Sequence, residues 1–419
     1  MSDTPRLLPQ EWMIAPETKK VMAALHRDGG SARFVGGCVR NALVNRKVID
    51  IDIATPLEPE DVISRLHDHQ LRHVPMGLLH GTVTALVDGK SFEITTLRKD
   101  MKGYGRHADV VFTTDWRVDA SRRDFTMNAL YATQDGEIFD YFNGIEDLRK
   151  GRVAFIGDPE ARIREDVLRI LRFFRFHAHF GQGAPEEAAL AACDKMSPLM
   201  PKLSVERVRQ EMLKLLEADR CAPVWQLMHE HRIVTHFLPE STNVGALKRL
   251  VTLEYINHGG TFPLRRLAAL LDVTTGGAIY IGQSLKLSAE QTAQLVKMVE
   301  LTPTIAAVTT PEAVRRLVYA LGNDMVLSLL LLSAARRNNE EGLFTLYNVA
   351  TNFRPPRFPL VGDDVIALGY AEGKEIGTML GAVEQWWMKQ DFAPGRTACL
   401  EKLQTDYGLK SDHHPDRAK

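Results

Sequence analysis

Apolar and polar positions alternate, or gather in short apolar runs, at several points in the first 145 residues of this 419-residue chain. Strict alternation over residues 48–55 predicts a strand. Residues 80–87 and 91–97 predict two strands joined across Asp88-Gly89, which is a strong hairpin signal. This part of the chain is therefore expected to be mixed α and β, with helices at 17–28, 38–45 and 59–67 and strands at 32–35, 48–55, 80–87, 91–97, 130–133 and 137–141.

The pattern changes from Arg149 onward, where apolar residues recur at helical spacing and few strand-like stretches follow residue 160. The simplest architecture is an α+β domain followed by an all-helical remainder. One core is not enough for this length, since single cores stop growing near ~250–300 residues. We therefore expect several domains, with further helices at 162–179, 204–217, 224–231, 264–271, 289–300, 312–319 and 324–336.

Composition narrows the class of protein. Hydrophobic residues make up 45% and charged residues 25%, as in ordinary globular proteins. No apolar run reaches roughly 18 residues, so no membrane span is expected, and the first residues lack a signal core, so we expect a cytoplasmic protein. A net charge of −1 argues against non-specific coating of nucleic acid but leaves room for a local basic cleft. The four cysteines form no CxxC pair, which argues against a zinc or disulfide framework.

The segment VIDIDIAT, residues 48–55, carries the first candidate chemistry. Side chains alternate faces along a strand, so the three isoleucines would face the core while Asp50 and Asp52 would share the other face. Two neighbouring carboxylates repel each other and gain by sharing a cation. Mg²⁺ suits them, because it prefers hard oxygen ligands and is often held by one or two carboxylates plus substrate phosphates. The alternative is a solvated strand face.

A third carboxylate, that of Glu93, lies in another stretch with alternating apolar and polar residues. In residues 91–95, Phe92 and Ile94 would face inward and Glu93 outward. If this strand lies beside the strand of Asp50 and Asp52, three acidic groups converge in the layout of a two-metal phosphoryl transfer. The alternative is that Glu93 simply faces solvent.

Gly36 and Gly37 lie where a predicted strand turns into a helix. Glycines at such a turn allow backbone N–H groups to approach a phosphate, and a helix N-terminus favours an anion. Arg40, in the first turn of that helix, would reach the same phosphates. A plain tight turn is the alternative for the glycine pair.

A set of short motifs follows in order along the chain. The stretches are Gly36–Arg40 (GGCVR), Asp50–Asp52 (DID), His80–Thr84 (HGTVT), Phe92–Arg98 (FEITTLR), Ser121–Ala129 (SRRDFTMNA), Glu165–Arg169 (EDVLR) and Glu206–Glu211 (ERVRQE). Together they resemble the motifs of the class II tRNA nucleotidyltransferases and bacterial poly(A) polymerases, and the resemblance covers roughly residues 30–220.

The resemblance implies a polymerase-β-like nucleotidyltransferase head followed by helical domains. We expect the head at 1–145, a neck with a nucleotide-selecting segment at 146–220, a body at 221–355 and a tail at 356–419. It also implies Mg²⁺ on Asp50 and Asp52, with Glu93 completing the catalytic set.

Two further segments resemble the nucleotide-binding motifs of the family. Arg123 and Asn128 would help hold the incoming nucleotide; the alternative for Arg123 is a structural pair with an acidic residue such as Asp124. Asp166 and Arg169, three apart on the predicted helix, would share a face. Spacing alone favours a surface salt bridge, whereas the resemblance implies that this pair selects CTP and ATP. The segment Glu206–Glu211 is expected to be structural, through Glu206, Arg207 and Glu211.

The chain departs from the family pattern at Asn41, where an aspartate usually follows the motif arginine. An amide at this position could still accept a hydrogen bond. Some relatives also carry a phosphohydrolase domain with paired His-Asp ligands. The nearest look-alike here ends at Asp272 with no histidine before it, so we expect no second activity.

The resemblance implies template-independent addition of CCA to the 3′ end of tRNA, at the acceptor stem, from CTP and ATP with release of pyrophosphate. The alternatives are a poly(A) polymerase, an enzyme that adds only part of CCA, and a non-catalytic RNA-binding protein. Residues 400–419 contain no long Lys/Arg run of the kind that many poly(A) enzymes carry, which favours CCA addition. Retention of the acidic residues argues against the non-catalytic alternative. The oligomeric state stays open.

Overall fold

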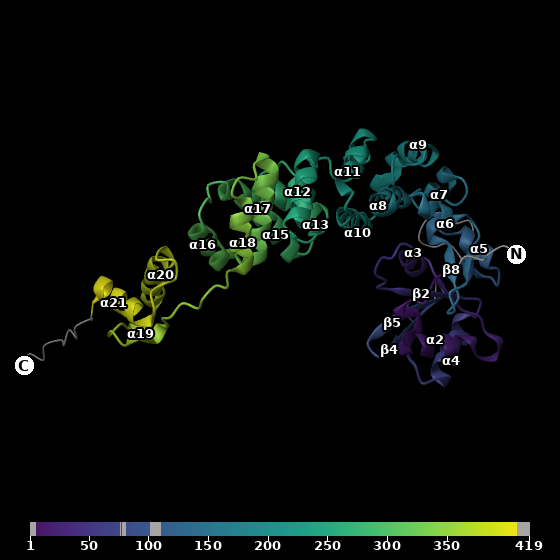
Figure 1. The fold of residues 1–419 in the computed structure, drawn as a ribbon, viewed down its shortest axis with the longest axis horizontal. Coiled ribbons are helices and arrows are strands. Elements are labelled where there is room, and N and C mark those ends of the chain that lie inside the picture. The colour runs from purple at the N-terminus through teal and green to yellow at the C-terminus, as the bar shows by residue number, and fades with distance from the viewer. Residues whose placement is uncertain (1–5, 76, 78–80, 101–109, 409–419) are drawn as a thin grey trace, which may run out of the picture. The chain divides into compact units, whose positions relative to one another are not determined.

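The computed structural model describes residues 6–75, 77, 81–100 and 110–408. The chain forms two compact units, Met1–Pro239 and Glu240–Lys419. The first contains every strand that the structure describes, and the described part of the second is helical (Figure 1). This is the α+β class with a helical remainder that the sequence predicts.

A seven-stranded mixed sheet forms the centre of the first unit, in the order β3-β4-β5-β2-β1-β8-β9. The strands β2 and β5 are parallel, and every other neighbouring pair is antiparallel. The strands are β1 (Arg33–Val35), β2 (Ile51–Thr55), β3 (Arg72–Val74), β4 (Thr82–Val87), β5 (Lys90–Thr96), β8 (Leu130–Ala132) and β9 (Ile138–Asp140). A separate two-stranded sheet pairs β6 (Arg98–Asp100) with β7 (Val110–Phe112).

One face of the large sheet is packed against helices. These are α2 (Pro16–His26), α3 (Gly37–Leu43) and α4 (Pro59–Asp68). Phe34, Ile53, Phe92 and Ile94 point into this core and are almost completely buried, as the alternation predicts. Each of the three helices begins and ends within one or two residues of its predicted limits.

Asp88 and Gly89 form the turn between β4 and β5, as predicted. Both residues have positive φ, 48° and 81°, which is the conformation of a two-residue hairpin loop that matches the twist of its strands. The hairpin between β8 and β9 is also present, with Gly136 at φ 90°. His80, the first residue of one predicted strand, lies outside the described residues.

The remaining helices of the first unit follow the sheet. They are α5 (Trp116–Ser121), α6 (Gly144–Arg149), α7 (Pro159–Glu165), α8 (Arg169–Phe180), α9 (Glu187–Met196), α10 (Val205–Leu216) and α11 (Cys221–Glu230).

The single helix predicted at 162–179 is wrong. The helix is interrupted between α7 and α8, because the backbone of Asp166 is extended, with φ −148° and ψ 105°. Its carboxylate accepts a hydrogen bond from the backbone N–H of Leu168 at 3.2 Å. A short polar side chain that bonds nearby backbone in this way competes with helix continuation. The next helix, α8, begins three residues later at Arg169.

The second unit is an array of helices with a buried charge cluster and a separate C-terminal core. Glu254 accepts hydrogen bonds from Arg265 (2.8 Å) and Arg266 (2.7 Å), and all three residues are buried. The helices are α12 (Val244–Ile256), α13 (Pro263–Leu270), α14 (Thr275–Ser284), α15 (Ala289–Ile305), α16 (Pro311–Leu321), α17 (Asn323–Arg337), α18 (Leu343–Asn352), α19 (Gly362–Ile366), α20 (Lys374–Lys389) and α21 (Arg396–Tyr407). Within the described ranges, no helix has the length and apolar character needed to cross a membrane.

Candidate active site

The acidic residues gather where β2 and β5 run side by side. The register pairs Asp52 directly with Glu93, so both carboxylates stand on one face, opposite the buried Ile53 and Ile94. Asp52 is half-buried and Glu93 is exposed. The predicted adjacency of the two strands is therefore present.

Asp50 is also exposed, but it precedes β2 rather than belonging to it. The expectation that Ile49 faces the core is wrong, since 79% of this residue is exposed. The ladder with β5 begins at Ile51, so the backbone before that residue is not held to the alternation of the sheet.

The Asp52 carboxylate lies close to other negative charge. Burial, followed by repulsion from Glu93, raises the pKa of Asp52 to about 6; Asp50 adds to this effect, while Arg123 and Arg40 oppose it. A divalent ion would relieve that repulsion, so the donor set suits one. Among the described residues, no three His, Cys, Asp or Glu side chains form a ready metal cage. Mg²⁺ fits such a site, since it commonly takes one or two carboxylates and completes its shell with substrate phosphates and water.

The turn from β1 into α3 brings Gly36 beside this face. Gly36 has φ 71° and ψ −117°, a conformation that L side chains avoid, and a Cβ there would lie 3.4 Å from Nη1 of Arg123. Its N–H donates to the carbonyl of Leu130 at 3.0 Å, which ties the turn to β8. Gly37 begins the short helix α3. Glycine at position 36 is therefore required by the backbone itself.

Arg40 is held by two amide side chains. Its Nη1 donates to Oδ1 of Asn128 at 2.5 Å, and its Nη2 donates to Oδ1 of Asn41 at 2.9 Å. The guanidinium also lies over the rings of Phe176 and Phe180, at 5.0 and 4.5 Å. The structure thus confirms that Asn41 accepts a hydrogen bond from the motif arginine in place of the usual aspartate.

Arg123 pairs with Asp119 rather than with Asp124. Its Nη2 lies 3.3 Å from Oδ2 of Asp119, and Tyr131 donates its hydroxyl to the same oxygen at 2.7 Å. Burial alone would raise the pKa of Asp119, but Arg123 and Arg122 outweigh it and hold that pKa below its usual value. Arg123 is therefore fixed in direction close to Gly36.

Asn128 is buried and has both ends of its amide engaged. Its Nδ2 donates to Oδ1 of Asp124 at 2.9 Å, while its Oδ1 accepts from Arg40. Asp124 in turn accepts from Nε of Arg172 in α8 at 2.7 Å. Asp124 and Arg172 were not among the predicted site residues. The signal for Asp124 was its place inside the matched segment, whereas nothing local marked its pairing across 48 positions.

The side chains of Asp166 and Arg169 have other partners, although the N–H of Arg169 donates to the carbonyl of Asp166 at 3.0 Å. The expectation that the two residues share one helix face is wrong, because the helix is interrupted at Asp166. Oδ2 of Asp166 accepts from Arg207 in α10 at 2.7 Å. Arg169 donates to Oε2 of Glu165 at 2.7 Å and to the carbonyl of Arg162 at 2.8 Å. Arg207, expected to be structural, thus contacts a candidate nucleotide-selecting residue directly.

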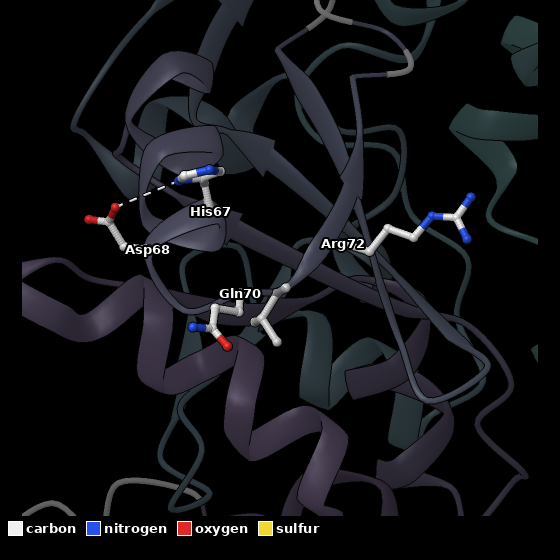
Figure 2. Close-up of a pocket in the computed structure, with 5 residues that line it drawn as sticks. His67, Asp68, Gln70 and Arg72 are labelled. Carbon is white, nitrogen blue, oxygen red and sulfur yellow. Dashed lines mark ion pairs between the residues drawn. The ribbon is translucent and has the colours of Figure 1, made fainter.

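A pocket of about 510 Å³ lies elsewhere, at the junction of α4 and β3 (Figure 2). His67 and Asp68 form a loose ion pair there, at 3.9 Å, and Arg72 points away from both of them. The strand β3 is at the edge of the sheet, with β4 and β5 between it and β2. None of the predicted site residues lines this pocket.

Comparison with known proteins agrees with this geometry. Residues 32–154 match the family described as Poly A polymerase head domain, and residues 184–244 match the one described as probable RNA and SrmB-binding site of polymerase A. The chain is 33% identical to CCA tRNA nucleotidyltransferase 1, mitochondrial, of Danio rerio, over 88% of this chain and 86% of that protein.

Solved structures show the same fold. The Bacillus stearothermophilus CCA-adding enzyme in complex with CTP matches with a TM-score of 0.73 and 26% identity, covering 93% of this chain and 96% of that one. The Thermotoga maritima CCA-adding enzyme complexed with tRNA matches in fold alone, with a TM-score of 0.63 and 19% identity over 92% and 93% of the two chains. The chain therefore belongs to the family of CCA-adding tRNA nucleotidyltransferases.

Proposed function

We propose that this chain adds CCA to the 3′ end of tRNA, with CTP and ATP as donors and pyrophosphate as the product that leaves. The observation that carries the proposal is the pairing of Asp52 with Glu93 across two parallel strands, next to the Gly36 turn. Such a face suits a nucleotide triphosphate bound through a divalent ion. The relatives named above support the choice of tRNA as acceptor.

Enzymes of this family generally use divalent metal ions, and we propose Mg²⁺ for this chain. Asp50 and Asp52 would hold the ion, and Glu93 would complete the catalytic set. When bound, the ion neutralises charge on the triphosphate and favours ionisation of the attacking 3′-hydroxyl. The open position of Asp50 and Glu93 supports this assignment, because substrate phosphates need access to the same ion.

The triphosphate would lie between the Gly36-Gly37 turn and two fixed guanidinium groups, those of Arg40 and Arg123. Both groups are oriented by side-chain hydrogen bonds before any ligand arrives, so little order has to be imposed when the nucleotide binds. Asn128 would act in this site through Arg40. No side-chain nucleophile is needed, since positioning and charge neutralisation account for most of the rate in phosphoryl transfer.

Nucleotide selection would rest on Asp166 and Arg169. They lie on either side of a break between two helices, one at the C-cap of α7 and the other at the start of α8. The carboxylate of Asp166 offers an acceptor and the guanidinium of Arg169 offers donors, so together they could match the polar edge of cytosine or of adenine. The alternative role as a mutual salt bridge loses support, because the two side chains bond other partners, Arg207 and Glu165, rather than each other.

We also propose that the chain works as head, neck, body and tail, at 1–145, 146–220, 221–355 and 356–419. The change from sheet to helices and the separate core around Trp387 support this division. A cytoplasmic location is likewise proposed. Because the vertebrate relatives are named mitochondrial, import into isolated mitochondria is the assay that would contradict it.

The test is direct. A tRNA transcript that ends before CCA is incubated with the protein and CTP alone, ATP alone or both, and the product ends are sequenced. We expect two C residues from CTP alone, nothing from ATP alone and a complete CCA from both. Failure to extend the transcript under all three conditions would contradict the proposal.

Poly(A) synthesis is the second candidate, because both matched family descriptions name a poly(A) polymerase. The same assay separates the two functions. A run of many A residues from ATP alone, without prior C addition, would favour the poly(A) alternative.

A further inference from the structure

A line of polar contacts leads from Arg40 to the helix α8. Arg40 donates to Oδ1 of Asn128 (2.5 Å), Asn128 donates through Nδ2 to Oδ1 of Asp124 (2.9 Å), and Arg172 donates through Nε to Oδ2 of Asp124 (2.7 Å). The residues come from three separate parts of the first unit. Arg40 lies in α3, the middle pair precedes β8, and Arg172 lies in α8.

Each contact fixes the direction of the next. An ionised carboxylate only accepts hydrogen bonds, so the amide of Asn128 must turn its NH₂ toward Asp124 and its oxygen toward Arg40. Oδ1 of Asp124 also accepts from the N–H of Phe125 at 2.8 Å. Both Asp124 and Asn128 are 7% exposed, so water offers little replacement for a lost partner. Turning any one of these groups would leave a buried polar atom unpaired, which is costly.

The charges of Asp124 and Arg40 favour the same orientation of these hydrogen bonds. Burial alone would raise the pKa of Asp124, but Arg172 together with the hydrogen bonds from Asn128 and Phe125 outweighs it and holds that pKa below its usual value. Burial, followed by repulsion from Arg175, lowers the pKa of Arg40 to about 10. Hydrogen bonds thus hold the Arg40 guanidinium close to other cations. This arrangement becomes electrostatically favourable when a bound anion neutralises the positive charge.

We infer that Arg172 and Asp124 are positioning residues that set the guanidinium of Arg40, through Asn128, for the triphosphate of CTP or ATP. The inference rests on the proposed function, since it takes Arg40 as a triphosphate contact. It means that α8, which begins at a residue of the nucleotide-selecting segment, also sets the grip on the phosphates. Binding of the base and binding of the triphosphate are then linked through one helix.

The test measures CTP affinity of the full chain with Mg²⁺ and without tRNA, by calorimetric titration. The variants are Arg172→Gln, Asn128→Ala and the double variant. We expect about tenfold weaker CTP binding in each single variant, as for loss of a charged hydrogen bond. The double variant should be no weaker than the weaker single one, because both changes break the same line of contacts. The KM for tRNA should stay within about twofold of wild type.

Arg149→Gln is the matched control. Like Arg172, Arg149 pairs with a carboxylate, in this case that of Glu146. Arg149 is exposed, however, and lies outside the line of contacts from Arg40 to Arg172. Its CTP affinity should equal that of wild type. If Arg172→Gln fails to fold, Asp124→Asn replaces it, since this variant keeps the side-chain shape and removes the charge that holds Arg172. The same tenfold loss and the same lack of additivity are expected.

Three results would overturn the inference: unchanged CTP affinity in the folded Arg172 or Asp124 variant, losses that add in the double variant, or an equal rise in the KM for tRNA. Wild-type protein that binds CTP but extends no tRNA would contradict the proposed function alone. The CTP affinities of the variants would still test the inference. Wild-type protein that binds no CTP would overturn both.

Discussion

At the scale of single residues, the site depends on side chains that are costly to hold together. Asp52 is half-buried beside Glu93, and its raised pKa reports that cost. A fold does not gain stability from such an arrangement. The pairing of these carboxylates is explained by a positively charged ligand, whose binding offsets their repulsion.

Glu93→Gln should weaken divalent-ion binding by roughly tenfold, equivalent to about 1.4 kcal/mol. The amide keeps the shape of the side chain but removes one of the negative charges that face the ion. Titration of the protein with Mn²⁺, followed by electron paramagnetic resonance, measures the affinity. Asp68→Asn is the control, since Asp68 lies by the pocket at the edge of the sheet and should have no effect. Equal affinity in wild type and Glu93→Gln would exclude Glu93 from the ion site.

His177 makes the stability of the first unit depend on pH. Burial, with a contribution from Arg220, lowers its pKa from 6.5 to about 4 in the folded chain. The unfolded chain therefore binds the proton more readily, so stability is complete above pH 6.5 and is lost as pH falls toward 4. The loss amounts to about 3 kcal/mol, at 1.36 kcal/mol per pKa unit.

Urea unfolding of wild type and His177→Phe across this pH range checks the prediction. Phenylalanine keeps the ring that stacks on Phe173 but does not titrate. The difference in unfolding free energy between the two proteins should shift in favour of the variant as pH falls. His67→Gln, at an exposed histidine, should follow wild type. A constant difference at every pH would contradict the assigned shift.

At the scale of elements, the turn from β1 into α3 is the most constrained connection of the site. Gly36→Ala should cost about 1–3 kcal/mol of unfolding free energy, because alanine is strained at φ 71° and ψ −117°. Gly37→Ala is the matched neighbour. Its Cβ would meet only Arg40 at 3.8 Å, an ordinary contact, so stability should not fall. Denaturant unfolding of both variants decides the matter, and equal stability of the two would contradict the strain at Gly36.

Helices and strands were predictable where the spacing of apolar residues alone decides the structure. Alternation over residues 91–95 predicted both the strand β5 and the outward direction of Glu93, because Phe92 and Ile94 have to reach the core. It failed at Ile49, since alternation says nothing about where the neighbouring strand begins to pair. The break at Asp166 was hidden for a similar reason. Apolar residues keep helical spacing through it, while one side-chain hydrogen bond to Leu168 decides the backbone.

Long-range pairing was the part of the site that the sequence did not reveal. Asp124 and Arg172 are separated by 48 positions, and Asp166 and Arg207 by 41. No local pattern specifies such partners, because each charge has many others at equal sequence distance. The candidate residues were therefore named more reliably than their contacts.

At the scale of the whole molecule, the two compact units have separate interiors and should respond separately to core mutations. Glu254→Gln removes the carboxylate that pairs with the buried side chains of Arg265 and Arg266. Breaking a buried ion pair by removing one partner costs about 3–5 kcal/mol. We expect a lower unfolding temperature for the second unit in calorimetry, with CTP affinity unchanged. A matching loss of CTP affinity would contradict the independence of the units.

The central claim is that the face of Asp52 and Glu93 is where nucleotide addition takes place. The most direct test is the single-turnover rate of C addition to a tRNA lacking CCA, in wild type and in Asp52→Asn, with folding checked by circular dichroism. Loss of a residue that holds the ion should slow the reaction by about a thousandfold, or about 4 kcal/mol of transition-state stabilisation. A folded Asp52→Asn protein that retains more than about a tenth of the wild-type rate would contradict the claim.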